Sequence, residues 1–176
     1  MRARKPWLFV TALMGSVVLG WIMTASSIGQ PKLMGFGDGT GMLDMRMFYT
    51  VPEAKTMLTS LCAEGVGVYT LIECIDYGFI LCLAYVMSQV FQFLTNKLGS
   101  PEKLRRLHWL SYSRGLFDVV ENTAILMSMH LLPAHDLVLG GAMIATMLKW
   151  LSLFLYLAAV LFAVMDRICF QRKQQE

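Results

Sequence analysis

The sequence predicts an all-α polytopic membrane protein, built as a four-helix transmembrane bundle with a short external amphipathic helix. Hydrophobic residues make up 56 % of the 176 residues, a share that a soluble domain of this length would struggle to bury. Four separate stretches each supply the ~20 mostly apolar residues that a membrane-spanning helix needs. Basic residues also flank these stretches on alternate sides. We therefore expect a single transmembrane domain over residues 1–176.

The four predicted spans account for nearly all of the apolar content. They are residues 7–28, 66–94, 116–132 and 137–165. The apolar run of the first is longer than the ~7–15 residues typical of a cleaved signal peptide, so we expect it to be retained. A basic N-terminus without acidic residues is also compatible with organelle import, and the organelle stays open. The third span is the least apolar, because three polar residues lie near its start.

The segment 29–65, between the first two spans, is expected to be external. Its glycine-rich part, 35–41, follows no strand and precedes no lysine-serine or lysine-threonine pair, so a flexible turn is favoured over a phosphate-binding loop. Thr50, Pro52 and Glu53 then match the capping-box start of a helix. Apolar residues follow at helical spacing, which predicts a short amphipathic helix on the outer surface.

The distribution of charge predicts the orientation. The loop 95–114 holds five basic residues: Lys97, Lys103, Arg105, Arg106 and Arg114. By the positive-inside rule, this loop and both termini face the cytoplasm, and an even number of spans gives the same result. This loop lies between two predicted spans, so nucleic-acid binding is not expected.

Ionisable residues inside the predicted spans are the main functional signal, because each costs roughly 2.5–3.5 kcal/mol at a bilayer centre. The second span carries two carboxylates three residues apart, and the third carries another such pair. The fourth carries a lysine and, two turns along the same face, a tyrosine. We expect the ligand-binding residues to be Tyr69, Glu73, Asp76, Asp118, Glu121, Asn122, Lys149 and Tyr156, with Glu73, Asp76 and Glu121 as the candidate catalytic groups.

The depth of these residues follows from the rise of 1.5 Å per residue in an α-helix. Counted from Leu137, Lys149 lies ~18 Å into a core ~30 Å thick. Counted from Arg114 at the opposite side, Glu121 lies ~10 Å deep. The two depths match, which predicts an ion pair between Lys149 and Glu121. Asp76 lies ~15 Å below the outer edge, near enough to join through water or a ligand.

Metal and cofactor sites are not expected. The four cysteines form no C-x-x-C pair and no zinc spacing. Neither acidic pair belongs to the Glu-x-x-His motif of di-iron bundles, and a nearby lysine would repel a cation. A hard ion held by oxygen ligands alone stays open as an alternative.

Several short patterns occur together: Asp44-x-Arg46-x-x-Tyr49, Gly65-x-x-x-Tyr69, the acidic pair of the second span, Asp118-x-x-Glu121-Asn122, and the lysine of the fourth span. In combination they resemble a group of small four-span membrane proteins of bacterial type. The resemblance covers residues 44–150. It implies that these positions belong together, and it implies no substrate.

These observations favour a pocket inside the membrane for a small amphiphilic or lipid-derived ligand, with possible acid–base chemistry of an isomerase kind. The alternative is a non-catalytic accessory subunit of a larger membrane complex. Its partner would bind the small-residue faces of the first and fourth spans, formed by Ser16, Gly20 and Thr24 and by Gly140, Gly141 and Ala145. Purely structural ion pairs and a proton or ion path remain open as well.

Overall fold

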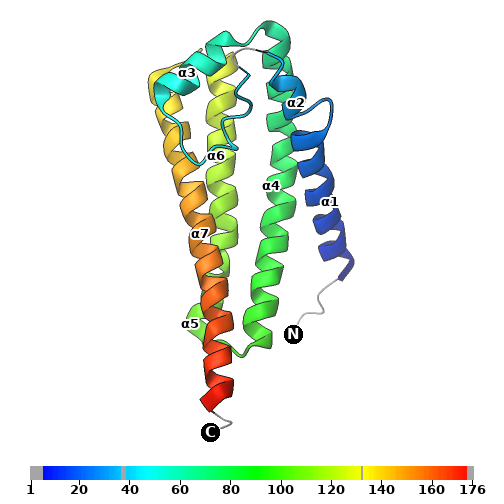
Figure 1. Ribbon diagram of the computed structural model, residues 1–176, viewed down its shortest axis with the longest axis vertical. Helices are drawn as coiled ribbons and strands as arrows, with labels where there is room; N and C mark the ends of the chain where they lie inside the picture. The colour runs from blue at the N-terminus through cyan, green and yellow to red at the C-terminus, as the bar shows by residue number, and fades with distance from the viewer. Residues whose placement is uncertain (1–5, 37–38, 132, 174–176) are drawn as a thin grey trace.

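The computed structural model describes residues 6–36, 39–131 and 133–173, and shows long helices standing side by side (Figure 1). The long helices are α1 (Pro6–Ala25), α4 (Ala63–Lys97), α6 (Leu110–His130) and α7 (Asp136–Lys173). Short helices occupy the connections: α2 (Gln30–Leu33), α3 (Val51–Ser60), α5 (Glu102–Arg105) and the 3₁₀ turn η1 (Arg106–Trp109). No strand occurs in this described part, so the all-α prediction is confirmed.

Three helical segments are long and apolar enough to cross a membrane: Pro6–Leu33, Ala63–Lys97 and Asp136–Ile168. The first combines α1 with α2 across a tight turn. A Cβ atom on Gly29 would lie 2.2 Å from the Met23 carbonyl oxygen, so only glycine fits at this turn. α6 is not among the three segments, because Arg114, Asp118 and Glu121 interrupt its apolar sequence.

The helices extend differently from the predicted spans. α1 ends at Ala25, three residues short of the predicted boundary, whereas α4 and α7 continue past both of theirs. Polar flanking residues such as Glu64 and Lys97 are compatible with a helix even where they are unsuited to lipid, so hydropathy underestimates helix length. α6 begins at Leu110, six residues before the predicted start. Residue 132, the predicted end of that span, lies outside the described residues.

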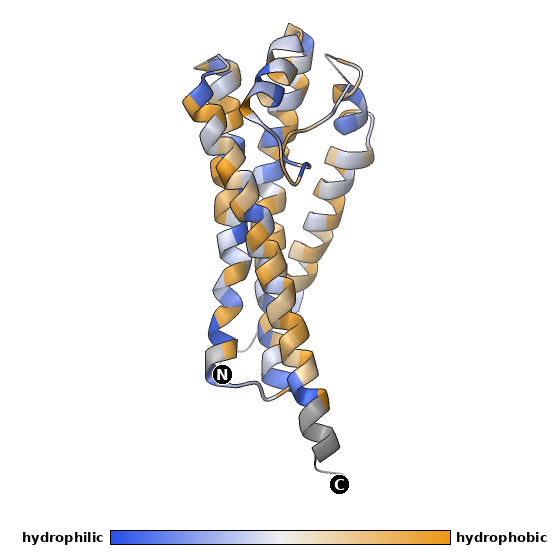
Figure 2. Cartoon of the chain, turned by 60° about the vertical axis from the view of Figure 1, so that its left-hand side comes forward, coloured by the Kyte–Doolittle hydropathy of each residue, from blue (hydrophilic) through white to orange (hydrophobic). Residues whose placement is uncertain are grey.

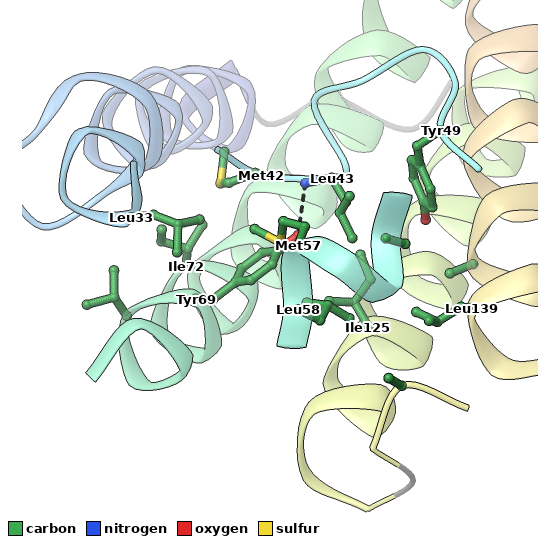
Figure 3. Packing of buried hydrophobic residues seen from close by; sticks show 14 of the residues in the cluster. Leu33, Met42, Leu43, Tyr49, Met57, Leu58, Tyr69, Ile72, Ile125 and Leu139 are labelled. Carbon is green, nitrogen blue, oxygen red and sulfur yellow. Dashed lines mark hydrogen bonds between the residues drawn. The ribbon is translucent and has the colours of Figure 1, made fainter. Parts of the chain in front are cut away.

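Neighbouring helices pack in the order α1, α4, α6 and α7. Two groups of buried apolar side chains lie between them. We call the end of the bundle that carries α3 the outer end, and the end that carries α5 the inner end. The outer cluster gathers side chains from α2, α3, the loop before α3 and the adjoining ends of the long helices (Figure 3). The inner cluster lies near α5 and consists of Met87, Phe91, Leu104, Leu110, Tyr156, Ala159 and Ala163. Hydrophobic residues predominate along α7, the helix that leads to the C-terminus (Figure 2), and several of them, such as Leu151, Phe154 and Phe162, are exposed.

The predicted capping box is present at the start of α3. The backbone N–H of Thr50 donates to Glu53 Oε2 at 2.7 Å, and Thr50 Oγ1 accepts from the Glu53 N–H at 3.4 Å. The Thr50 N–H and the Thr50 hydroxyl both donate to Glu53 Oε2, and these two bonds hold the pKa of the Glu53 carboxyl below its usual value. α3 packs against α7 at the outer end of the bundle and buries Ala54, Met57 and Leu58.

The segment between α2 and α3 departs most from expectation. Its glycine-rich part turns through left-handed conformations at Gly39 and Gly41, with φ of 71° and 77°. The chain then folds back into the bundle between the helices (Figures 1 and 2). Met42, Leu43 and Tyr49 are 2 %, 0 % and 1 % exposed. We call residues 41–49 the inserted loop. Its two ends are therefore part of the core, whereas Met45, Met47 and Phe48 between them are exposed.

Candidate functional site

Lys149 is the centre of a charged group inside the bundle. It lies about 20 Å along α7 from Asp136, and its side chain is 5 % exposed. Its Nζ lies 2.9 Å from Asp118 Oδ1 and 2.6 Å from Glu121 Oε2. The two carboxylates are three residues apart and share one face of α6. The predicted pair of Lys149 with Glu121 is confirmed, and Asp118 joins it.

Further contacts complete this group. Arg114 lies one turn before Asp118 on α6, and its Nη2 is 3.2 Å from Asp118 Oδ2. Thr146 on α7 donates its hydroxyl to Glu121 Oε1, and its Oγ1 lies 3.3 Å from the Tyr49 hydroxyl. The group thus contains two cations and two carboxylates, so its formal charges balance.

The inserted loop is bonded to α7 through its backbone. Lys149 Nζ donates its third hydrogen bond to the Asp44 carbonyl oxygen at 2.8 Å. One residue further along α7, Trp150 Nε1 donates to the Arg46 carbonyl oxygen at 2.9 Å. The loop carbonyls that point into the bundle are satisfied in this way, as buried backbone requires.

The same loop is bonded to α4. The Leu43 N–H donates to the Tyr69 hydroxyl at 2.9 Å, shown by the dashed line in Figure 3. The next residue, Asp44, lies on the loop and not in a spanning helix. Burial raises the pKa of its carboxyl to about 7, against the opposing effect of the Lys149 ammonium. Asp44 therefore titrates near neutrality.

The two carboxyl groups of α4 lie beside this group without a cation of their own. Glu73 and Asp76 are 1 % and 4 % exposed. Asn122 Nδ2 donates to Asp76 Oδ2 at 2.6 Å, whereas neither carboxyl oxygen of Glu73 has a hydrogen-bond partner among the described residues. The charges of Asp44, Asp76 and Glu121 act on Glu73, so its side chain faces the same interior region.

A cavity of about 180 Å³ opens next to these groups. Its polar wall is made by Asp44, Asp76, Arg114, Asp118 and Lys149. Its apolar wall is made chiefly by Met23, Met42, Met45, Phe79, Trp150 and Leu153. Helices α1 and α7 both contribute to its lining, and Thr24 and Met45 are the exposed residues in that lining.

Most of the predicted site residues meet in this region. Tyr69, Glu73, Asp76, Asp118, Glu121, Asn122 and Lys149 lie on the facing sides of α4, α6 and α7. Tyr156 lies elsewhere, because two further turns carry it about 10 Å toward the inner end. There its hydroxyl donates to the Met87 carbonyl oxygen at 3.0 Å, and its ring packs at 5.7 Å from that of Phe91.

Four contributors were not expected from the sequence: Asp44, Tyr49, Thr146 and Trp150. Asp44 and Tyr49 belong to the Asp44-x-Arg46-x-x-Tyr49 pattern, which was noted only as part of the resemblance. Thr146 lies three residues before Lys149, and this spacing places it on the same face of α7. These two signals are present in the sequence, but neither shows that the loop enters the bundle.

No arrangement for metal binding is seen in the part of the chain that the structure describes: no group of three or more His, Cys, Asp or Glu side chains is placed to hold an ion. Cys62, Cys74 and Cys82 are free thiols. The chemistry offered is that of carboxyl groups, one ammonium and one guanidinium beside an apolar wall.

Comparison with known proteins found no similar protein. No protein family matches the chain, and no curated protein or solved structure matches it at a significant level.

Proposed function

We propose that this chain is a four-span membrane protein whose outer half holds a pocket for a small amphiphilic or lipid-derived molecule. The cavity beside Lys149 is the observation that supports this most directly. One wall carries charged side chains and the other carries Met, Phe, Trp and Leu side chains. A pocket of this kind suits a ligand with a polar head and an apolar body.

α6 is proposed as the fourth span. Its 21 residues give a length of about 31 Å, close to the ~30 Å core of a bilayer. Glu121 and Asn122 are fully buried, whereas Leu116 and Val120 are 61 % and 46 % exposed. The helix thus keeps its charges inside the bundle and presents apolar side chains outward, as charged residues in spanning helices do.

The proposed orientation places the end with α5 in the cytoplasm. Lys97, Arg105 and Arg106 lie at this end, as the positive-inside rule requires. At the opposite end Lys32 pairs with Glu64 at 3.3 Å, and Lys55 pairs with Asp136 at 2.9 Å. α3 is then the external amphipathic helix. The N-terminal charges Arg2, Arg4 and Lys5 lie outside the described residues.

Acid–base chemistry is compatible with this pocket. The Glu121 carboxyl is held in place by Lys149 and Thr146, so it is suited to positioning the head group of a ligand. Glu73 and Asp76 have no cation partner and are better placed to exchange a proton with a ligand. Isomerisation of a lipid-soluble substrate is the reaction class that such carboxyls support.

The accessory-subunit alternative depends on free small-residue faces, and part of each face is buried within the chain, whereas Thr24 and Gly141 remain exposed. A Cβ atom on Gly20 would lie 3.3 Å from Phe79 Cε2, and one on Gly15 would lie 3.0 Å from Cys82 Sγ, both on α4. Ala145 on α7 is 3 % exposed. These contacts join helices of the same chain and leave less of each face for a partner protein, which favours the pocket.

Native mass spectrometry of the protein in a mild detergent tests the proposal. Thr24→Trp fills the opening of the cavity. Thr11→Trp is its matched control, because both threonines are exposed on α1 and donate to the carbonyl four residues earlier. We expect a small-molecule mass on the wild type and on Thr11→Trp that is lost from Thr24→Trp. A stoichiometric protein partner without any small adduct would contradict the pocket.

A further inference from the structure

The charges around the cavity divide into a balanced group and an unbalanced one. Arg114 and Lys149 are matched by Asp118 and Glu121, through the contacts given above. Three carboxyl groups then remain: Asp44, Glu73 and Asp76. No ion pair joins any of the three side chains to a Lys or Arg in the described part of the chain.

Lys149 has no further N–H with which to bind these three carboxyl groups. An ammonium has three N–H donors, and those of Lys149 are directed at Asp118, Glu121 and the Asp44 backbone carbonyl. Asn122 gives Asp76 one neutral hydrogen bond. Glu73, 1 % exposed, receives none at either oxygen. A buried carboxyl without partners is costly, and a cationic group brought beside it lowers that cost.

The cavity determines which kind of cation fits. About 180 Å³ is roughly six times the ~30 Å³ that one water occupies in the liquid, so a bare ion would fill little of it. The described residues also contain no group placed to bind a metal ion. The remaining wall is apolar, and the rings of Phe79 and Trp150 can receive a cation on their faces. Trp150 is held in place by its bond to the Arg46 carbonyl.

Resting on the proposed function, we propose that the ligand of this pocket is an amphiphile whose head group is a protonated amine. Its ammonium binds Asp76 and Asp44 at the polar wall, and the charge of Glu73 acts from one turn behind Asp76. Its apolar chain lies along Phe79 and Leu153 and leaves between α1 and α7. Both helices present apolar side chains outward, so the ligand enters from the bilayer.

The test compares three probes of one chain length: dodecylamine, dodecanol and dodecanoate. Each is titrated against the full chain in lipid nanodiscs, and binding is followed by native mass spectrometry. We expect the amine to bind at least about tenfold more tightly than the alcohol, because a hydrogen bond to a charged group is stronger than a neutral one. Dodecanoate should bind most weakly. This comparison uses the wild-type protein, so it does not depend on a variant that folds.

Asp76→Asn should reduce the preference for the amine to less than about threefold, since the side chain keeps its shape and loses its charge. Glu73→Gln is the second variant, with the same direction of effect, should Asp76→Asn not be recovered folded. Asp166→Asn is the matched control, because Asp166 is an exposed carboxylate on α7 outside the cavity. It should leave the preference unchanged.

Each of the other outcomes contradicts one named part of the proposal. Equal binding of amine and alcohol, or a preference for the amine that Asp76→Asn leaves intact, refutes the amine head group. Tightest binding of dodecanoate shows that Arg114 and Lys149 select the ligand instead. In each of these cases, loss of binding in Thr24→Trp still upholds the pocket. If Thr24→Trp binds all three probes as the wild type does, the proposed function itself fails.

Discussion

The outer and inner halves of this bundle are held together in different ways. In the inner half, α4, α6 and α7 meet through Phe91, Tyr156 and smaller apolar side chains, as in most packed helices. In the outer half, a segment from outside the long helices enters between them and bonds to both α4 and α7. Charged side chains lie where the loop tip meets the helices.

The outer half therefore holds its side chains in defined positions, whereas the inner half mainly holds the helices together. Apolar packing tolerates small changes of shape, whereas a buried charged group tolerates little loss of a partner. The outer half therefore combines a cavity with side chains whose positions are tightly determined. A binding site needs this combination. The cavities of about 200 and 470 Å³ in the inner half are lined instead by exposed charged side chains such as Arg106 and by side chains of α1 and α4.

The largest expected effect comes from Lys149→Met, which leaves Asp118 and Glu121 buried without their shared cation. We expect a loss of about 3–5 kcal/mol in the free energy of unfolding. The inner-half counterpart, Tyr156→Phe, removes one hydrogen bond and should cost about 0.5–1.5 kcal/mol. Thermal unfolding in detergent, followed by tryptophan fluorescence, measures both.

A control for Lys149→Met is to add Asp118→Asn and Glu121→Gln, which neutralise the two stranded carboxylates. Most of the lost stability should return in this triple variant. The contrast between the halves is wrong if Lys149→Met costs no more than Tyr156→Phe.

Tyr69→Phe should have an intermediate effect, because it leaves the buried Leu43 N–H without an acceptor. The expected loss is about 1–3 kcal/mol. Hydrogen–deuterium exchange over residues 41–49 should become faster, since the loop loses its bond to α4. Tyr85→Phe is the control on the same helix, as the Tyr85 hydroxyl makes no hydrogen bond to a described residue. Rapid exchange of this loop in the wild type would show that it is not held inside the bundle.

The smallest effect is expected from Thr50→Ala, which removes the side-chain cap of α3. A lost cap costs about 1 kcal/mol, and here the loss should be confined to residues 51–60. Faster exchange in α3 with unchanged exchange in α6 is the predicted pattern. Thr59→Ala is the control, because its hydroxyl donates only to carbonyls within the same helix. A spread of the effect to Lys149 would mean that α3 supports the charged group.

Regular helix geometry explains what the sequence predicted. The match in depth between Lys149 and Glu121 needed only a constant rise per residue, and the shared face of Asp118 and Glu121 needed only their spacing. The same reasoning grouped Tyr156 with Lys149, because residues seven apart lie on the same face of a helix. That reasoning left out the distance between them along the axis of α7, which places Tyr156 in the inner cluster.

The inserted loop could not be predicted in the same way. Residues 41–49 have no helical or strand periodicity, and a preceding glycine run is typical of a mobile turn. Their hydrogen bonds to α4 and α7 join residues 26 to 105 positions apart, and local pattern contains no information on such pairs. The apolar residues Met42, Leu43 and Tyr49 were the available sign that this segment is buried.

The bonds between the inserted loop and α7 impose an order on biogenesis. Lys149 and Trp150 follow their loop partners by 105 and 104 residues. At about 5–20 residues per second, the ribosome needs on the order of 5–20 seconds to make the intervening chain. The loop's bond to Tyr69 on α4 can form early, whereas its bonds to α7 cannot form during that interval. Docking of the loop against α7 is therefore a late step of folding.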